Sequence, residues 1–295
     1  MIKITFMGAG STVFLRNVLG DCIYTDALKG MEIALYDIDG QRLEQSAAIL
    51  EAINKGNGCP ASIRSYLGAE NRRKALSGAD FVINAIQVGG YDPCTITDFE
   101  IPKKYGLRQT IADTLGVGGI MRALRTIPVL EDFARDMEAV CPNAWFLNYT
   151  NPMSMLTGYM LRYTGVKTLG LCHSVQTCSK TLMDAIGMSD RLEGRRELIA
   201  GINHMGWLLK IEDKDGNDLY PEIKRRAAAR TEKHDDMVRY ELMKRFGYYV
   251  TESSEHNAEY TPYFIKDKYP ELIERFNIPL DEYPRRCIKH EENWA

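Results

Sequence analysis

The sequence predicts an α/β fold in which a Rossmann-like domain on a parallel sheet precedes an α+β domain. The chain opens on an apolar strand that runs into a glycine-rich turn, Gly8 to Ser11. Strands and helices then alternate up to about residue 190, which indicates right-handed βαβ units and a parallel sheet. Beyond that point the pattern changes to neighbouring strands and charged helical sequence. We therefore expect domains at 1–190 and 191–295.

Each element is marked by an apolar run or by helical spacing of apolar residues. In the first domain we expect strands at 2–7, 31–36, 81–86, 144–147 and 166–171, and helices at 13–24, 41–54 and 121–139. In the second domain, 198–203 and 207–212 are predicted to form antiparallel strands, and 220–246 is predicted to be mostly helical. Because residues 291–295 carry no stop signal, we expect the C-terminal part of this domain to be truncated.

Composition excludes several classes of protein. The chain of 295 residues is 45% hydrophobic and 26% charged, which is typical of a globular protein. Its net charge of −3 provides no basic surface for nucleic acid, and no apolar run reaches the roughly 20 residues that span a membrane. The N-terminus lacks a signal-peptide layout and the seven cysteines show no disulfide spacing, so we expect a cytoplasmic protein with reduced thiols.

A dinucleotide site is predicted where the first strand ends. Gly8 and Gly10 allow the backbone to turn and to approach a pyrophosphate, and the following helix adds its N-terminal dipole. Asp37 ends the second strand, where a carboxylate accepts hydrogen bonds from ribose hydroxyls and repels a 2′-phosphate, so NAD is favoured over NADP. A plain strand–helix turn is the alternative. Three further residues are assigned to the cofactor site: Ser11, Thr12 and Asn84.

A thiol and an imidazole indicate a metal site. Cys172 ends a predicted parallel strand, where open sheets place their ligands, and His204 follows 32 residues later. Thiolate and imidazole are good ligands of divalent transition metals, and their softness favours zinc. Two protein ligands leave positions for substrate oxygens or water. The alternative is a buried cysteine and a core histidine.

Seven motifs occur in order along the chain, and together they carry a family resemblance. They are Gly8-Ala9-Gly10-Ser11, the segment Ile111 to Gly119, Asn148 to Pro152, Cys172-His173-Ser174, Gly201 to Met205, Thr251 to His256 and Glu259 to Pro262. In these motifs the chain resembles glycoside hydrolase family 4, and it closely resembles the melibiase-type α-galactosidases of that family. The resemblance extends from Lys3 to about Cys287. The family is an exception to hydrolysis by two carboxylates.

The resemblance implies an architecture like that of lactate and malate dehydrogenases, NAD and a divalent metal, usually Mn²⁺, as cofactors, and a small-molecule glycoside as substrate. It also implies hydrolysis by oxidation and elimination. NAD⁺ takes hydride from C3 of the sugar, a base removes the C2 proton, the aglycone leaves C1, water adds, and NADH returns the hydride. The metal stabilises the enolate.

Residue roles follow from the same resemblance. Cys172 and His204 match the metal-binding positions of the family. Tyr260 is the expected C2 base, and its rivals are Glu255, His256 and Glu259. His173 and Asp113 are the candidates for the leaving-group proton, and Asp113 is alternatively a support for the metal. Substrate contacts are expected from Asn151, Asn203 and Arg285.

Several alternatives stay open. Cys-His-Ser at 172–174 is typical of members acting on unphosphorylated glycosides, but α-glucosides, α-glucuronides and α-galacturonides compete with α-galactosides. A lactate- or malate-type dehydrogenase and a non-catalytic NAD-binding fragment are rival functions. The family implies a homo-oligomer, either a dimer or a tetramer. Arg122 and Arg125, three apart on a helix, are expected on its solvated face.

Overall fold

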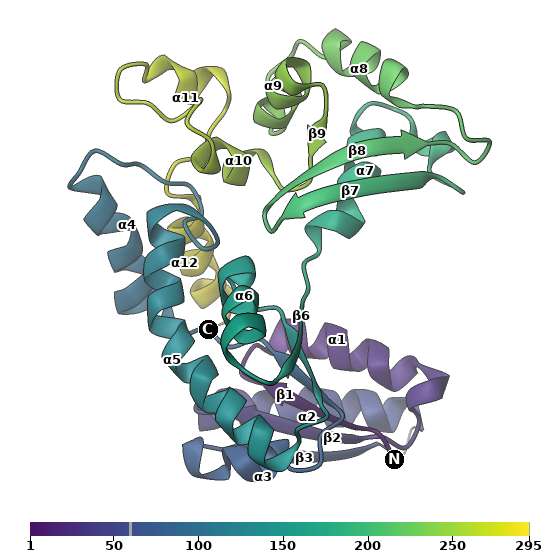
Figure 1. Cartoon of the computed structure of the whole chain (residues 1–295), viewed down its shortest axis with the longest axis vertical. Coiled ribbons are helices and arrows are strands. Elements are labelled where there is room, and N and C mark those ends of the chain that lie inside the picture. The colour runs from purple at the N-terminus through teal and green to yellow at the C-terminus, as the bar shows by residue number, and fades with distance from the viewer. Residues whose placement is uncertain (59–60, 295) are drawn as a thin grey trace. The chain divides into compact units, whose positions relative to one another are not determined.

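The computed structural model describes residues 1–58 and 61–294, which form two compact units. Unit 1 contains Met1–Val88 and Ala123–Leu171, and unit 2 contains Gly89–Arg122 and the chain from Cys172 onward. The predicted domains 1–190 and 191–295 are contiguous stretches, whereas these units are interleaved in the sequence. Figure 1 shows the elements of each unit in the colours of their position along the chain.

Unit 1 is built on a six-stranded sheet with the order β3-β2-β1-β4-β5-β6, in which every neighbouring pair is parallel. Its strands are β1 (Lys3–Met7), β2 (Glu32–Asp37), β3 (Ser62–Leu67), β4 (Phe81–Asn84), β5 (Trp145–Asn148) and β6 (Lys167–Gly170). Its helices are α1 (Thr12–Tyr24), α2 (Gly40–Gly56), α3 (Arg72–Leu76) and α6 (Met153–Tyr163), together with most of α5 (Gly116–Val140). This doubly wound parallel sheet confirms the predicted α/β fold.

Helices cover both faces of this sheet, because alternate residues of each strand point to opposite sides. On one face, Phe6 and Leu35 pack against Leu15 and Leu19 of α1 and against α2. On the other face, strand residues such as Phe146 pack with α3, α5 and α6. Burial on both faces explains why the central strands are mainly apolar, and hence why sequence alone predicts them.

Strand β3 and helix α6 were not predicted from the sequence. β3 lies at the edge of the sheet and reads Ser-Ile-Arg-Ser-Tyr-Leu, with its polar residues exposed, so it lacks the apolar run that marks the inner strands. Helix α5 begins at Gly116, five residues before the predicted start at 121. Sequence alone places the start too late because the first turn is rich in glycine, which disfavours helix.

Unit 2 is the predicted α+β part and contains an antiparallel sheet with the order β7-β8-β9. Its strands are β7 (Arg196–Ile202), β8 (Met205–Glu212) and β9 (Tyr249–Val250). Its helices are α4 (Ile96–Lys103), α7 (Ser174–Ala185), α8 (Tyr220–Ala229), α9 (Met237–Phe246), α10 (Ser254–Tyr260), α11 (Glu271–Arg275) and α12 (Glu282–Trp294). Short helical turns lie at Asp26–Leu28, Ala69–Asn71, Gly90–Thr95 and Ser189–Arg191 of the two units.

Two apolar clusters hold unit 2 together. Leu208 and Ile211 of β8 pack against α7, α8 and Met243 of α9. Val238 and Leu242, on another side of α9, pack against Val250 of β9 and the segment that follows it. The segment from 251 to 260 is thereby fixed beside β8, which places its polar residues near the β7–β8 hairpin. Within residues 1–58 and 61–294, no helix has the length and apolar character needed to cross a membrane.

Candidate functional site

The hairpin between β7 and β8 carries the predicted metal-binding histidine. Ile202 ends β7 and pairs with Met205, which begins β8, so Asn203 and His204 form the turn between them. Gly201 has φ +139°, and a Cβ there would lie 2.3 Å from the carbonyl oxygen of Met205, so glycine is needed at this close approach. The hairpin therefore holds His204 in a defined place, where it is buried.

Cys172 and Glu252 form a group of three metal-ligating side chains with His204. The ligand atoms of the three residues all lie within 4.8 Å of one another. His204 Nε2 lies 3.4 Å from Glu252 Oε2, and Cys172 Sγ accepts the backbone N–H of Ser174 at 3.5 Å. A thiolate, an imidazole and a carboxylate around one point form a donor set suited to a divalent transition metal. These residues therefore fit the metal that the sequence implies.

Cys172 and His204 alter each other's protonation. Burial raises the pKa of the Cys172 thiol, but hydrogen bonding to His204 and Ser174 outweighs burial, so this pKa lies below its ordinary value. Burial lowers the pKa of His204, but the Cys172 thiolate and Glu252 outweigh it, so this pKa lies above its ordinary value. The thiol therefore gives up its proton readily, as a metal-ligating cysteine must.

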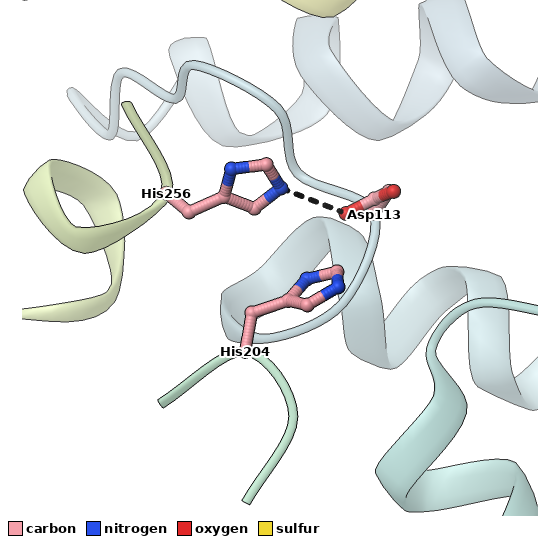
Figure 2. Close-up of side chains that lie close together, drawn as sticks. All are labelled: Asp113, His204 and His256. Carbon is pink, nitrogen blue, oxygen red and sulfur yellow. Dashed lines mark ion pairs between the residues drawn. The ribbon is translucent and has the colours of Figure 1, made fainter. Parts of the chain in front are cut away.

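Figure 2 shows a second group, in which Asp113 and His256 lie beside His204. His256 Nε2 is 3.9 Å from Asp113 Oδ1, and the rings of His204 and His256 meet edge to face with centroids 4.9 Å apart. His256 Nδ1 shares a hydrogen bond of 2.7 Å with Ser253 Oγ, and burial lowers the pKa of His256. Because His204 belongs to both groups, five residues form what we call the polar cluster: Asp113, Cys172, His204, Glu252 and His256.

The loop that carries Asp113 is held by Glu259 of α10. The Glu259 carboxylate accepts the backbone N–H groups of Thr110, Ile111 and Ala112 at 2.7, 3.1 and 2.8 Å. Burial raises the pKa of Glu259 to about 7, although the three backbone donors act in the opposite direction. Glu259 was a rival to Tyr260 as the base, and its oxygens are engaged by this loop.

The predicted base, Tyr260, lies against the polar cluster. Its hydroxyl donates to Asp113 Oδ1 at 3.5 Å, and its ring lies 5.7 Å from that of His256, centroid to centroid. Burial, together with the nearby carboxylates of Asp113 and Glu259, raises the pKa of Tyr260 well above its ordinary value. To act as a base, the phenol therefore needs a nearby positive charge to offset these effects.

Three other predicted residues of unit 2 have different surroundings. Both polar atoms of the Asn203 side chain are buried and have no hydrogen-bond partner within the described residues. A buried amide without partners is costly, so Asn203 suits a ligand that would supply them. His173 is exposed immediately before α7. Arg285 is exposed on α12, where it binds Glu282 at 2.8 Å and the carbonyl of Leu280 at 2.6 Å.

In unit 1, the predicted dinucleotide turn is closed by Asp37. The Asp37 carboxylate accepts the backbone N–H of Gly10 at 2.6 Å and those of Ile38 and Asp39 at 2.8 and 2.9 Å. Gly8 has φ +89°, and a Cβ on it would lie 2.8 Å from the backbone of Ala85. The turn therefore requires glycine, and it leads directly into the N-terminus of α1, where a pyrophosphate site is expected.

The remaining predicted residues of unit 1 make contacts within the unit. The Thr12 hydroxyl is buried and shares a hydrogen bond of 2.9 Å with Ser46, while Ser11 lies immediately before α1 without capping it. Asn84 is fully buried and donates to Asn148 at 2.9 Å and to Thr150 at 3.0 Å. Asn151 Oδ1 accepts the N–H of Met153 at 3.3 Å at the start of α6.

Sequence alone assigned no role to Glu252, which lies in the site, and predicted the wrong surroundings for Arg122. Glu252 stands within the quoted motif Thr251 to His256 but received no role, because the segment between β9 and α10 gives no sign of which side chains face His204. Arg122 is buried rather than solvated, and its guanidinium lies 5.8 Å from the centre of the Tyr283 ring. The expectation of a solvated face was wrong because Arg122 is covered by Tyr283 of α12, a helix that the sequence did not predict.

Comparison with known proteins gives family matches along almost the whole chain. Residues 3–188 match the model described as family 4 glycosyl hydrolase, and residues 199–295 match that of the family 4 glycosyl hydrolase C-terminal domain. The alpha-galactosidase of Bacillus subtilis (strain 168) is 65% identical over 295 residues, which is 100% of this chain and 67% of that protein.

Solved structures resemble the chain over almost its full length. The crystal structure of lplD from Bacillus subtilis is 28% identical in sequence and matches with a TM-score of 0.82. The match covers 99% of this chain and 69% of the lplD chain. The 6-phospho-beta glucosidase from Thermotoga maritima was solved with manganese, NAD⁺ and glucose-6-phosphate. It is 22% identical and matches with a TM-score of 0.75, and the match covers 99% of this chain and 65% of the glucosidase chain. The chain therefore spans about two thirds of the length of the proteins it matches.

Proposed function

Because the chain belongs to family 4 of the glycosyl hydrolases, we propose that it takes part in the NAD- and metal-dependent hydrolysis of α-galactosides of the melibiose type. The observation that carries the proposal is the group formed by Cys172, His204 and Glu252, whose ligand atoms lie within 4.8 Å of one another. The sugar is proposed from the 65% identical alpha-galactosidase. The cofactors, NAD and Mn²⁺, are proposed from the Thermotoga maritima structure solved with both.

When bound, NAD⁺ and the metal supply oxidation at C3 and polarisation of the resulting ketone, which makes the C2 proton of the sugar acidic. Cys172 and His204 are proposed to hold the metal, with Glu252 at the third position. Gly8, Gly10 and Asp37 are proposed to bind NAD, because the glycine turn leads into the N-terminus of α1, which suits a pyrophosphate, and Asp37 keeps a lone pair for a ribose hydroxyl.

Tyr260 is proposed to take the C2 proton at its phenolic oxygen. Its hydroxyl donates to Asp113 Oδ1 at 3.5 Å, and burial together with this carboxylate raises the pKa of the phenol, so the phenolate requires the positive charge that a bound metal would supply. Of the two candidates for the leaving-group proton, Asp113 belongs to the polar cluster, whereas His173 is exposed at the start of α7. We therefore place Asp113 ahead of His173 in that role.

Sugar recognition is proposed for Asn203, whose buried amide lacks partners within the described residues. A carboxamide can both donate to and accept from sugar hydroxyls. Asn151 and Arg285 are retained as further proposed substrate contacts. The proposal also includes a homo-oligomer, dimer or tetramer, in a reducing cytoplasm that keeps the Cys172 thiol free.

The test is release of p-nitrophenol from its α-galactoside with NAD⁺, Mn²⁺ and a thiol reductant, each omitted in turn. Activity that requires all three supports the proposal, and the α-glucoside and α-galacturonide assayed beside it identify the sugar. Reaction in D₂O should place deuterium at C2 of the product, because that proton is exchanged during the reaction. Net accumulation of NADH with a 2-hydroxy acid would instead identify a dehydrogenase.

Cys172→Ser should abolish this activity, because a serine hydroxyl is a poor ligand for a transition metal. Cys94→Ser is the matched control, since Cys94 is a partly buried free cysteine of the same unit outside the polar cluster. Equal loss in both variants would mean that Cys172 has no special role.

A further inference from the structure

Thr114 joins two members of the polar cluster through one hydroxyl group. Its Oγ1 lies 2.8 Å from Asp113 Oδ1 and 3.0 Å from His204 Nδ1, and the residue is fully buried. None of the functional roles assigned above involves this side chain. Its position matters because it touches His204 at Nδ1, the ring nitrogen that does not face Glu252.

The hydroxyl has a single proton to give. A carboxylate only accepts hydrogen bonds, so the contact with Asp113 uses the Thr114 proton. The contact with His204 must then run the other way, with Nδ1–H donating to Thr114 Oγ1. A neutral imidazole carries one N–H, so Nε2 keeps its lone pair. Nε2 is also the nitrogen that lies 3.4 Å from Glu252 Oε2, in the group with Cys172.

We propose that Thr114 is the positioning residue of the metal site, which fixes His204 in the Nδ1–H form and orients Nε2 as the metal ligand. The inference rests on the proposed function, since it assumes the metal held by Cys172 and His204. A ligating histidine commonly donates its second N–H to an oxygen that sets its tautomer and orientation. Here that oxygen belongs to a neutral hydroxyl, which Asp113 in turn polarises.

The backbone around Thr114 leaves the hydroxyl little freedom. Ala112, two residues earlier, has φ +53°, an unfavourable conformation for alanine that Glu259 holds with a hydrogen bond of 2.8 Å to its N–H. On the other side, a Cβ at Gly119 would lie 2.7 Å from the carbonyl carbon of Thr114. The first turn of α5 thus packs directly against the backbone of Thr114, and the hydroxyl is held in place from both sides.

The first experiment measures Mn²⁺ affinity without substrate, from the free-ion signal in electron paramagnetic resonance. Thr114→Val keeps the shape of the side chain and removes the hydroxyl, so affinity should fall about 10- to 100-fold. Thr114→Ser keeps the hydroxyl and should stay within about threefold of the parent protein. Thr95→Val is the control, because Thr95 is also buried in unit 2 but its hydroxyl donates to the carbonyl of Gly90.

The second experiment reads the tautomer in the parent protein and so does not depend on how a variant folds. With ¹⁵N-labelled histidine and Zn²⁺ as a diamagnetic probe, His204 should show a metal-bound Nε2 and a slowly exchanging Nδ1–H. His204→Gln assigns the signal among the five histidines. Fast exchange of this proton in Thr114→Val, and slow exchange in Thr114→Ser, would support the inference.

The outcomes separate this inference from the proposed function. Metal bound through Nδ1, or an unchanged Mn²⁺ affinity in Thr114→Val, overturns the role of Thr114 and leaves the metal site standing. A parent protein that binds no Mn²⁺ overturns both.

Discussion

The carboxylate of Glu259 accepts the backbone N–H of Ala112 at 2.8 Å, and Ala112 adopts φ +53°. A residue of α10 thus stabilises an unfavourable backbone conformation in a loop 147 positions earlier in the chain. The next residue of that loop is Asp113 and the next residue of α10 is Tyr260, and these two are in contact. One short helix therefore fixes the loop and supplies the candidate base that meets it.

Replacing Glu259 should change how stability depends on pH. The pKa of Glu259 rises from an ordinary value of 4.5 to about 7, so the folded protein binds more protons than the unfolded chain between these values. The free energy of unfolding should therefore fall as pH rises from about 4.5 to 7, by about 3 kcal/mol from this group. Urea titrations at several pH values should show this fall in the parent protein.

Glu259→Gln should lose that component of the pH dependence, because glutamine does not titrate. The exposed Glu232→Gln serves as the control and should keep it. If the parent protein and Glu259→Gln lose stability in parallel across this range, the buried carboxyl is not the titrating group.

Gly118→Ala should destabilise the protein. A Cβ at position 118 would lie 2.6 Å from the Cβ and the carbonyl oxygen of Ala112, and neither can move without shifting the Asp113 loop. We expect a loss of about 1–3 kcal/mol in the free energy of unfolding, as for an overpacked core. Gly158→Ala is the matched control, because a Cβ on this glycine of α6 meets nothing within 4 Å and should add about 0.5–1 kcal/mol. Thermal melting of the two variants should thus shift in opposite directions.

Asp37→Ala should weaken NAD binding by tenfold or more. The substitution removes the acceptor for Gly10 N–H and the proposed partner of a ribose hydroxyl. Calorimetric titration with NAD⁺ measures the effect. Asp39→Ala is the control, because Asp39 caps α2 through Arg42 N at 3.1 Å, and its loss should cost about 1 kcal/mol of stability while NAD affinity is retained. Similar affinities for the Asp37 variant and the parent protein would remove Asp37 from the site.

Iodoacetamide should modify Cys172 before the buried cysteines. The pKa of Cys172 lies below its ordinary value, whereas burial raises the pKa of Cys141 to about 11 and that of Cys178 to about 12. Since the thiolate is the reactive form, the labelling rate at Cys172 should rise with pH and reach half of its plateau value below pH 9, the ordinary pKa of a cysteine. His204→Asn should move this profile to higher pH, and Mn²⁺ should protect the thiol. Peptide mass spectrometry gives the order, and labelling of Cys141 first would contradict the prediction.

The parts of the fold that sequence predicts are those with a repeating local signal. The central strands β1, β2 and β4 are buried on both faces, so each appears as a mainly apolar run. In the edge strand β3 only Ile63 and Tyr66 are half-buried, and they lie on opposite faces, so its six residues give no comparable signal. Helices α10 to α12 are short or highly charged, which hides them among loop residues.

The site shows the same division. Cys172, His204 and Asp37 could be proposed from sequence because each follows or lies within a recognisable strand pattern or motif. The surroundings of Glu252, Thr114 and Arg122 could not be predicted, because they are set by residues distant in the sequence. Thr114 and His204, for example, lie 90 positions apart, and Arg122 is covered by a helix that was not predicted. Pairing of this kind is decided by tertiary packing, which no local pattern records.

The separation between Asp113 and Tyr260 has a consequence for synthesis on the ribosome. The two residues touch in the folded protein but lie 147 positions apart in sequence. At about 5–20 residues per second, Tyr260 is added roughly 7–30 seconds after Asp113. For part of that interval the nascent chain contains Cys172 and His204 but not yet α10, the helix that completes their surroundings. The polar cluster can therefore assemble only after α10 has been synthesised, and any metal it takes up should enter after that point.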